Sequence, residues 1–220
     1  MAILSDLVES IAEVEDIDPA TIGLIARYIR EAGLIATHGR GPSAAKMSAT
    51  DAANLLIGVN ATSTAVEAPR VVRAYRRLHA SEAPVLSDPS LDIPLGTLGE
   101  AIEQLLHGAG RGELAQPFAG KLLGSEFLEA FARGHVHIEL RFCKSEKTAT
   151  LRMTECLLSD EIEPEREHEL LDARSPDFVW KFKSAVSRGP PADKIKPGSD
   201  RIEETTIGYR TLHAVGRLIG

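Results

Sequence analysis

Two neighbouring segments, 136–143 and 148–154, alternate between apolar and polar side chains, and this restricts the fold more than any other feature of the chain. A period of two places the apolar side chains on one face of a β-strand. The four residues between the segments, Lys144–Lys147, have a suitable length for the loop of a hairpin. The sequence therefore predicts two antiparallel strands in a sheet that has one apolar face.

If residues 144–147 form the loop, they fix the register of this hairpin. Glu139 then lies opposite Arg152, which is a favourable cross-strand charge pair. The same register keeps Cys143 and Cys156 far apart, so we do not expect a disulfide between them. The apolar side chains are expected to face each other in three pairs: Ile138 with Met153, Leu140 with Leu151, and Phe142 with Ala149.

Segments with helical periodicity surround the hairpin, which indicates an α+β fold. Helices are expected at 98–107, after a capping box at 97–100, and at 118–133. Residues 178–182 form either a short strand or an anchor between a loop and the core, and a further strand is expected at 202–207. Such a sheet would have an exposed edge and an apolar face, both suited to self-association. A closing helix carries four apolar residues on one face: Leu212, Val215, Leu218 and Ile219.

The first sixty residues contain three further helical patterns. Apolar spacing predicts a helix over 3–14, and Asp18-Pro19 supplies the N-cap and the first residue of the next helix. Gly33 ends this second helix as its C′ residue. Ser48–Asp51 resembles a capping box and introduces a third helix over 52–59. Two helices joined by a turn of a few residues have the layout of a helix-turn-helix.

A small basic hairpin is expected between the second and third helices. Residues 34–37 have extended character, and residues 38–43 contain Gly and Pro and must turn. Residues 44–47 can return as a second short strand. A hairpin directly after the second helix is the arrangement of a winged helix-turn-helix, and the third helix would close its three-helix core.

The residues of this region resemble a known family. The segment Asp18–Ile35, which ends in the run REAGLI, is similar to the recognition helix of winged helix-turn-helix bacterial regulators. The segment Gly39–Ile57 resembles prophage-type proteins of alphaproteobacteria. The resemblance covers roughly residues 3–60, about a quarter of the chain. It departs from the family at Gly23 and Leu24, where base-reading side chains are usually polar.

The resemblance implies that the helix over 19–32 lies in the major groove of DNA, with its N-terminal half towards the base edges. It also implies that the hairpin reaches the DNA backbone or the minor groove, where the negative potential attracts basic side chains. The alternative is a solvated basic face on a small helical protein. The DNA-binding residues implied by the resemblance are Thr21, Arg27, Tyr28 and Arg30 of the helix, and His38, Arg40 and Lys46 of the hairpin.

A second basic stripe is indicated by the spacing of Arg70, Arg73 and Arg77, at i, i+3 and i+7 along a helix that has an apolar face. This helix starts either with Thr64 as its cap or at Pro69. Its arginines are candidate phosphate contacts, and each neutralised phosphate would steepen the salt dependence of binding. The alternative is that they pair with acids of the C-terminal domain or stay solvated.

Charge is distributed unevenly along the chain. Residues 1–18 hold six acids and no Lys or Arg, whereas residues 19–80 hold eight Lys or Arg and three acids. Residues 81–220 hold 17 Lys or Arg and 23 acids, so that the whole chain has a net charge of −7. Such asymmetry hints at a nucleic-acid-binding module beside an acidic domain. We therefore predict three parts: a winged helix-turn-helix domain at 1–62, a basic helix and linker at 63–96, and an α+β domain for dimerisation or partner contact at 97–220.

Several other classes of protein are not expected. The chain holds no apolar run near the ~20 residues of a membrane span, and its first residues are not those of a secretory signal. Its two cysteines fit reduced thiols in the cytoplasm, and His135 and His137 lack a third metal ligand at useful spacing. Neither a phosphate-binding loop nor a Gly-x-Ser-x-Gly turn occurs. We expect a protein that is not an enzyme and needs no metal or cofactor.

These observations predict a sequence-specific DNA-binding transcriptional regulator of phage or prophage-like origin. It is expected to be a cytoplasmic, nucleoid-associated homodimer that binds double-stranded DNA and no membrane. One alternative is a phage DNA-packaging or replication accessory protein that resembles a small terminase and forms a ring of many subunits. Another alternative is an adaptor that binds protein instead of DNA.

Overall fold

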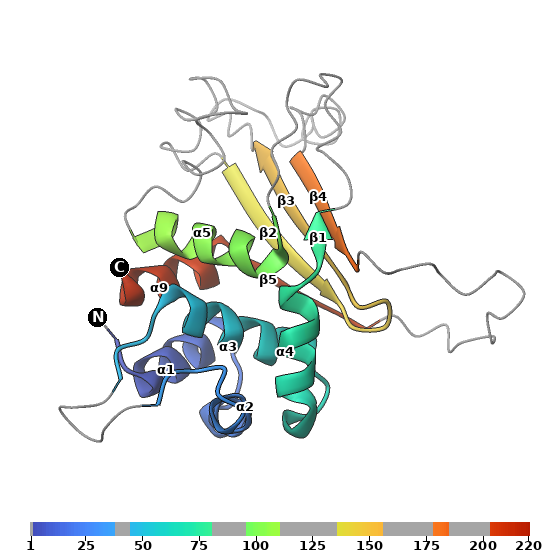
Figure 1. Ribbon diagram of the computed structural model, residues 1–220. Helices are drawn as coiled ribbons and strands as arrows, with labels where there is room; N and C mark the ends of the chain where they lie inside the picture. The colour runs from blue at the N-terminus through green and yellow to red at the C-terminus, as the bar shows by residue number, and fades with distance from the viewer. Residues whose placement is uncertain (1, 38–44, 81–95, 111–135, 156–177, 185–202) are drawn as a thin grey trace, which may run out of the picture.

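The computed structural model describes residues 2–37, 45–80, 96–110, 136–155, 178–184 and 203–220 (Figure 1). The helices in these ranges are α1 (Leu4–Glu15), α2 (Pro19–Glu31), α3 (Ala49–Ala61), the 3-10 helix η2 (Ala65–Glu67), α4 (Ala68–Arg76), α5 (Leu98–Gly110) and α9 (Tyr209–Ile219). The strands are β1 (His79–Ala80), β2 (Val136–Cys143), β3 (Thr148–Glu155), β4 (Phe178–Lys183) and β5 (Glu204–Gly208). The expected helix at 118–133 lies outside the described residues, as do His135 and Cys156.

The five strands form one antiparallel sheet in the order β1-β4-β3-β2-β5. The predicted hairpin of β2 and β3 lies inside this sheet, with residues 144–147 as its loop. Of the two alternatives for residues 178–182, the structure shows the strand, β4. The strand expected at 202–207 is confirmed as β5, with its ends shifted by one or two residues. The predicted register of the hairpin is also confirmed, since the observed partners include Ile138 with Met153, Glu139 with Arg152, Leu140 with Leu151, and Phe142 with Ala149.

The apolar face of the sheet packs against the helices, which Figure 1 shows gathered on one side of it. Phe142 and Trp180 are fully buried in this core. Tyr75 of α4 links the two layers, because its ring centroid lies 6.0 Å from that of Phe142 and its hydroxyl donates to the Cys143 carbonyl at 2.7 Å. The expectation that the apolar face serves self-association is therefore wrong, since the helices of the same chain cover it.

Local signals set the start and end of α2 and the capping box of α3 as predicted, although α3 extends beyond the expected 52–59 at both ends. The Asp18 carboxylate accepts a backbone N–H at 3.1 Å at the start of α2, and Pro19 is the first helical residue. Gly33 follows α2 with a φ of 73°, which side chains other than glycine rarely adopt. Ser48 and Asp51 form the capping box of α3. These ends depend on groups a few residues apart, which explains why the sequence alone predicts them.

The helix α3 lies at the centre of the fold. It contacts α2, α4, α5, α9 and the sheet, and 11 of its 13 residues are buried. The residues of α3 are mostly small or apolar, so every side of this helix can pack. Gly58 permits a close approach of α2, because a Cβ atom at this position would overlap the Ile29 side chain.

The two strands expected for the wing are not formed by residues 34–37 and 45–47. The backbone of the first segment instead bonds to side chains of α3. The Asn54 amide donates to the Leu34 carbonyl at 2.6 Å, and the Ala36 N–H donates to Asp51 at 2.9 Å. These hydrogen bonds use the Leu34 carbonyl and the Ala36 N–H, which would otherwise be available to pair with a neighbouring strand. The tip of the expected hairpin, residues 38–44, lies outside the described residues, and a winged helix-turn-helix is not confirmed.

Residues on both sides of the predicted domain boundary share one hydrophobic cluster. The helix α1 contacts α9, and the Ala2 N–H donates to the Leu218 carbonyl at 3.1 Å. In the segment predicted as a linker, β1 pairs with β4 and places His79 opposite Lys183. The division into three domains stays a prediction, while the described parts of all three pack together.

Candidate nucleic-acid interface

One face of α2 points to solvent and carries the residues that the resemblance assigns to DNA. Thr21, Arg27 and Arg30 are exposed, and Tyr28 is half-buried. The apolar stripe on the opposite face is buried, so the spacing argument placed these side chains on the correct side of the helix. Leu24 is 47% exposed on the same helix, at a position where the resemblance leads us to expect a polar side chain.

Two of the predicted DNA-binding arginines form ion pairs with acids three or four residues away in the sequence. Arg27 Nε lies 2.7 Å from the Glu31 carboxylate, and Arg70 Nη2 lies 2.6 Å from the Glu67 carboxylate. All four side chains are largely exposed. Exposed pairs of this kind contribute only about 0–1 kcal/mol, so a phosphate can replace either carboxylate at small cost.

The second basic helix is confirmed as α4, which begins at Ala68, one residue before the later of the two starts considered. The 3-10 helix η2, with Thr64 at its N-cap position, directly precedes it. Arg70, Arg73 and Arg77 are all exposed. Arg73 Nη2 donates to the carbonyl of Ala32, the C-cap of α2, at 3.1 Å. A cation is favourable at this end of a helix because the free carbonyls carry partial negative charge. This contact places the basic stripe of α4 beside the last turn of α2.

The three residues assigned to the expected wing are only partly accounted for. Lys46 is exposed just before α3, whereas His38 and Arg40 lie outside the described residues. The structure therefore places Arg73 of α4 at the C-terminal end of α2. The tip of the expected wing, which would extend the surface of α2 and α4, lies outside the described residues.

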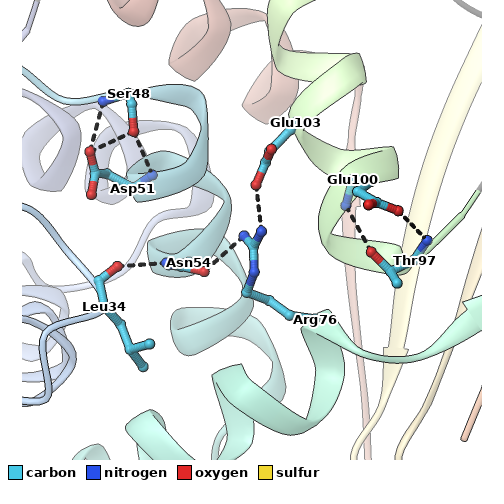
Figure 2. Close-up of polar contacts among 8 residues, drawn as sticks. All are labelled: Leu34, Ser48, Asp51, Asn54, Arg76, Thr97, Glu100 and Glu103. Atoms are coloured by element: carbon cyan, nitrogen blue, oxygen red, sulfur yellow. Dashed lines mark hydrogen bonds and ion pairs between the residues drawn. The ribbon is translucent and has the colours of Figure 1, made fainter.

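Arg76 belongs to the same basic segment of the sequence but has an internal role, as Figure 2 shows. Its Nη1 donates to the Asn54 side-chain oxygen at 3.0 Å, and its Nη2 lies 2.6 Å from the Glu103 carboxylate. The side chains of Arg76 and Glu103 are only 25% and 23% exposed. Because Asn54 also bonds to Leu34, these contacts connect the segment after α2 with α3, α4 and α5.

The position of Arg76 in the sequence could have identified it as an internal residue. A count of charges does not include this information. Arg76 comes four residues after the buried Val72, and residues at this spacing share one side of a helix. The basic stripe instead consists of Arg70, Arg73 and Arg77. Helical position therefore distinguishes Arg76, whose side chain is mostly buried and bonded to α3 and α5, from the three exposed arginines of the stripe.

The described residues contain no group of three or more His, Cys, Asp or Glu that could hold a metal ion. Among the helices that the structure describes, none has the length and apolar character needed to cross a membrane. The comparisons with protein-family models, with curated proteins and with solved structures gave no match for this chain.

Proposed function

We propose that this protein binds double-stranded DNA through the surface of α2 and α4 and acts as a transcriptional regulator of phage or prophage-like origin. The observation that carries the proposal is the contact between Arg73 and the Ala32 carbonyl, which joins two basic helices into one surface. Around this contact, Arg30, Arg70 and Arg77 are exposed. Such a cluster can neutralise several phosphates along one stretch of DNA backbone.

The proposed division of labour assigns a different contact to each helix. The exposed Thr21 at the start of α2 would face base edges, while arginines at the end of α2 and on α4 would contact phosphates. Phosphate contacts position a protein on DNA, and base contacts give the sequence preference. Lys46 and the segment after α2 would add contacts to the neighbouring backbone, in the place of a wing.

The proposal includes a homodimer, since two copies of α2 about one DNA turn apart would read a pseudo-palindromic site. Measuring the molar mass in solution separates the alternatives. A dimer agrees with regulation, whereas a ring of many subunits would favour the packaging or replication accessory role.

The direct test is duplex binding at several salt concentrations, for example from about 50 to 200 mM, where phosphate contacts dominate the salt dependence. The double variant Arg30→Ala/Arg77→Ala should weaken binding and lower the slope of log affinity against log salt by about two, because two phosphate contacts are lost. A matched control is Arg152→Ala/Arg217→Ala, which removes two exposed arginines outside α2 and α4. This control should retain the original slope.

Two results would contradict the proposal. The first is that the unaltered protein binds no duplex at low salt, which would favour the adaptor. The second is an equal loss of affinity in both double variants. The affinity for DNA would then depend on the net charge of the protein and not on the surface of α2 and α4. If duplex binding is established, selection of bound sequences from a random pool gives the preferred site.

A further inference from the structure

A pocket of about 460 Å³ lies on a different part of the molecule, between the end of α1, α3, β5 and the start of α9. Its volume is within the range of small-molecule sites in proteins. Figure 1 shows the three helices that contribute to it, α1, α3 and α9, close together. None of its lining residues is among those assigned to DNA, so a role for this pocket is independent of the proposed function.

One part of the pocket lining offers hydrogen-bond acceptors. Glu15, the last residue of α1, is half-buried there, and Asn60 of α3 donates its Nδ2 to both carboxylate oxygens at 3.1 and 3.3 Å. Burial raises the pKa of Glu15 from 4.5 to about 7, and the hydrogen bond from Asn60 partly opposes this effect. No basic side chain in the described part of the chain forms an ion pair with this carboxylate.

The side-chain oxygen of Asn60 also has no partner among the described residues, but it is closed to solvent and is not a contact for a ligand in the pocket. This residue is 1% exposed, and its Oδ1 has no hydrogen bond among the described residues. Rotating the amide by half a turn would not help, because its Nδ2 also donates to the Leu56 carbonyl at 3.2 Å. The exchange would place Oδ1 against that carbonyl and against the carboxylate of Glu15. The free acceptor is therefore a feature of the fold.

The other part of the lining is electropositive. Gly208, Tyr209 and Arg210 line it where α9 begins, and the N-cap Gly208 provides no side chain to bond the first helical N–H groups. Free N–H groups at a helix start carry partial positive charge and bind anions. The first turn of α9 holds no acid, and Arg210 adds a full positive charge. Besides Glu15, the titratable groups that line the pocket are Tyr209 and Arg210.

We propose that this pocket binds a free α-amino acid, with its ammonium group at Glu15 and its carboxylate at Arg210 and the start of α9. A zwitterion satisfies both parts of the lining at once. A simple amine would leave the positive end unpaired, and a simple carboxylate would leave Glu15 unpaired. The volume left beyond these two charged groups would hold the side chain of the amino acid.

The test is calorimetric titration of the full chain with each of the standard amino acids at pH 8, where the Glu15 carboxylate is mostly ionised. The amino acid that binds best is then compared with two matched probes: the amine that lacks its carboxylate and the acid that lacks its amino group. For phenylalanine these are 2-phenylethylamine and 3-phenylpropanoate. We expect one or more amino acids to bind and both matched probes to bind at least about ten-fold more weakly, since each lacks one charged interaction.

Variants of the protein complete the test. Glu15→Gln and Arg210→Ala should each weaken binding at least about ten-fold. The controls Glu13→Gln, an exposed acid on α1, and Arg217→Ala, an exposed base on α9, should bind as the unaltered protein does. Thermal unfolding of each variant confirms that it folds, and Glu15→Gln is isosteric with the native residue.

Three results would overturn the proposal. One is the absence of binding for every amino acid at millimolar concentration. The second is equal affinity for the amine or the acid probe, which would make the pocket a cation site or an anion site. The third is unchanged affinity in Glu15→Gln or Arg210→Ala. None of these readouts depends on DNA, so failure here and failure of the proposed function are distinguishable.

Discussion

The guanidinium of Arg76 donates to the side-chain oxygen of Asn54 at 3.0 Å, between α4 and α3. The same arginine holds Glu103, and the same asparagine holds the carbonyl of Leu34. This polar connection crosses four segments that are far apart in the sequence, and Figure 2 shows all of its members. The side chains of Arg76 and Glu103 are mostly buried. Removing one of them would therefore leave the charge of the other unpaired and poorly hydrated.

Arg76→Ala should lower the free energy of unfolding by about 2–4 kcal/mol, because Glu103 and Asn54 would both lose a partner. The adjacent Arg77 is exposed, so Arg77→Ala should change stability by no more than about 0.5 kcal/mol. Urea unfolding followed by circular dichroism measures both variants. Equal effects of the two substitutions would mean that the internal contacts of Arg76 contribute nothing.

Gly216→Ala should also destabilise the protein, because α5 and α9 approach each other closely at this glycine. A Cβ atom there would lie 2.7 Å from the Leu106 carbonyl oxygen and 3.1 Å from the Gly110 nitrogen. These backbone atoms cannot move without separating the helices, so we expect a loss of about 1–3 kcal/mol.

Gly23→Ala is the matched control for this substitution. It makes the same change within a helix, but nothing lies within 4 Å of the added methyl group. Alanine is the better helix former, so this variant should gain about 0.5–1 kcal/mol. The two midpoints of thermal unfolding should therefore move in opposite directions. A shared direction would contradict the close packing of α5 on α9.

The raised pKa of Glu15, about 7, predicts that stability depends on pH. A carboxyl group whose pKa is higher in the folded state contributes its full stability below the unfolded value near 4.5, and this contribution is lost as the pH rises through 7. Between pH 5 and 9 the native protein should lose about 1–3 kcal/mol relative to Glu15→Gln, which cannot ionise. Unfolding curves across this range measure the difference. Glu13→Gln, at an exposed position of α1, should parallel the native protein throughout.

Asp51 should be the most sensitive residue of the α3 capping box, because it is 7% exposed and accepts three hydrogen bonds. These come from the Ser48 N–H at 2.9 Å, the Ser48 hydroxyl at 2.6 Å and the Ala36 N–H at 2.9 Å. Asp51→Ala should cost about 2–4 kcal/mol, whereas Ser48→Ala should cost only about 1 kcal/mol.

Hydrogen exchange distinguishes the two roles of Asp51. The Ala36 amide should exchange much faster in Asp51→Ala, since its acceptor is removed, and should be little affected in Ser48→Ala. The exposed neighbour Thr50 gives a control variant, Thr50→Ala, that should leave this amide protected. Slow exchange of Ala36 in Asp51→Ala would show that another group protects the segment after α2.

Sequence reasoning failed where the outcome depended on distant groups. Residues 34–37 have extended character, but side chains of α3 bind their backbone and the expected strand is not formed. The apolar face of the sheet has a pattern suited to self-association, but it packs against helices of its own chain. For the candidate DNA surface, helical spacing identified the exposed side of each helix. It did not indicate that Arg73 would join α4 to the end of α2.

The local structure of this protein follows from short-range patterns in its sequence. These patterns determine where α1, α2 and α3 begin or end, and the register of β2 and β3, because caps and alternation act over a few residues. Which faces meet and which polar groups become buried depends instead on how the helices and the sheet pack together. Glu15 and Asn60 lie 45 positions apart, and neither has a local pattern that predicts their contact. Burial of charge depends on everything packed around it, and that is a property of the whole fold.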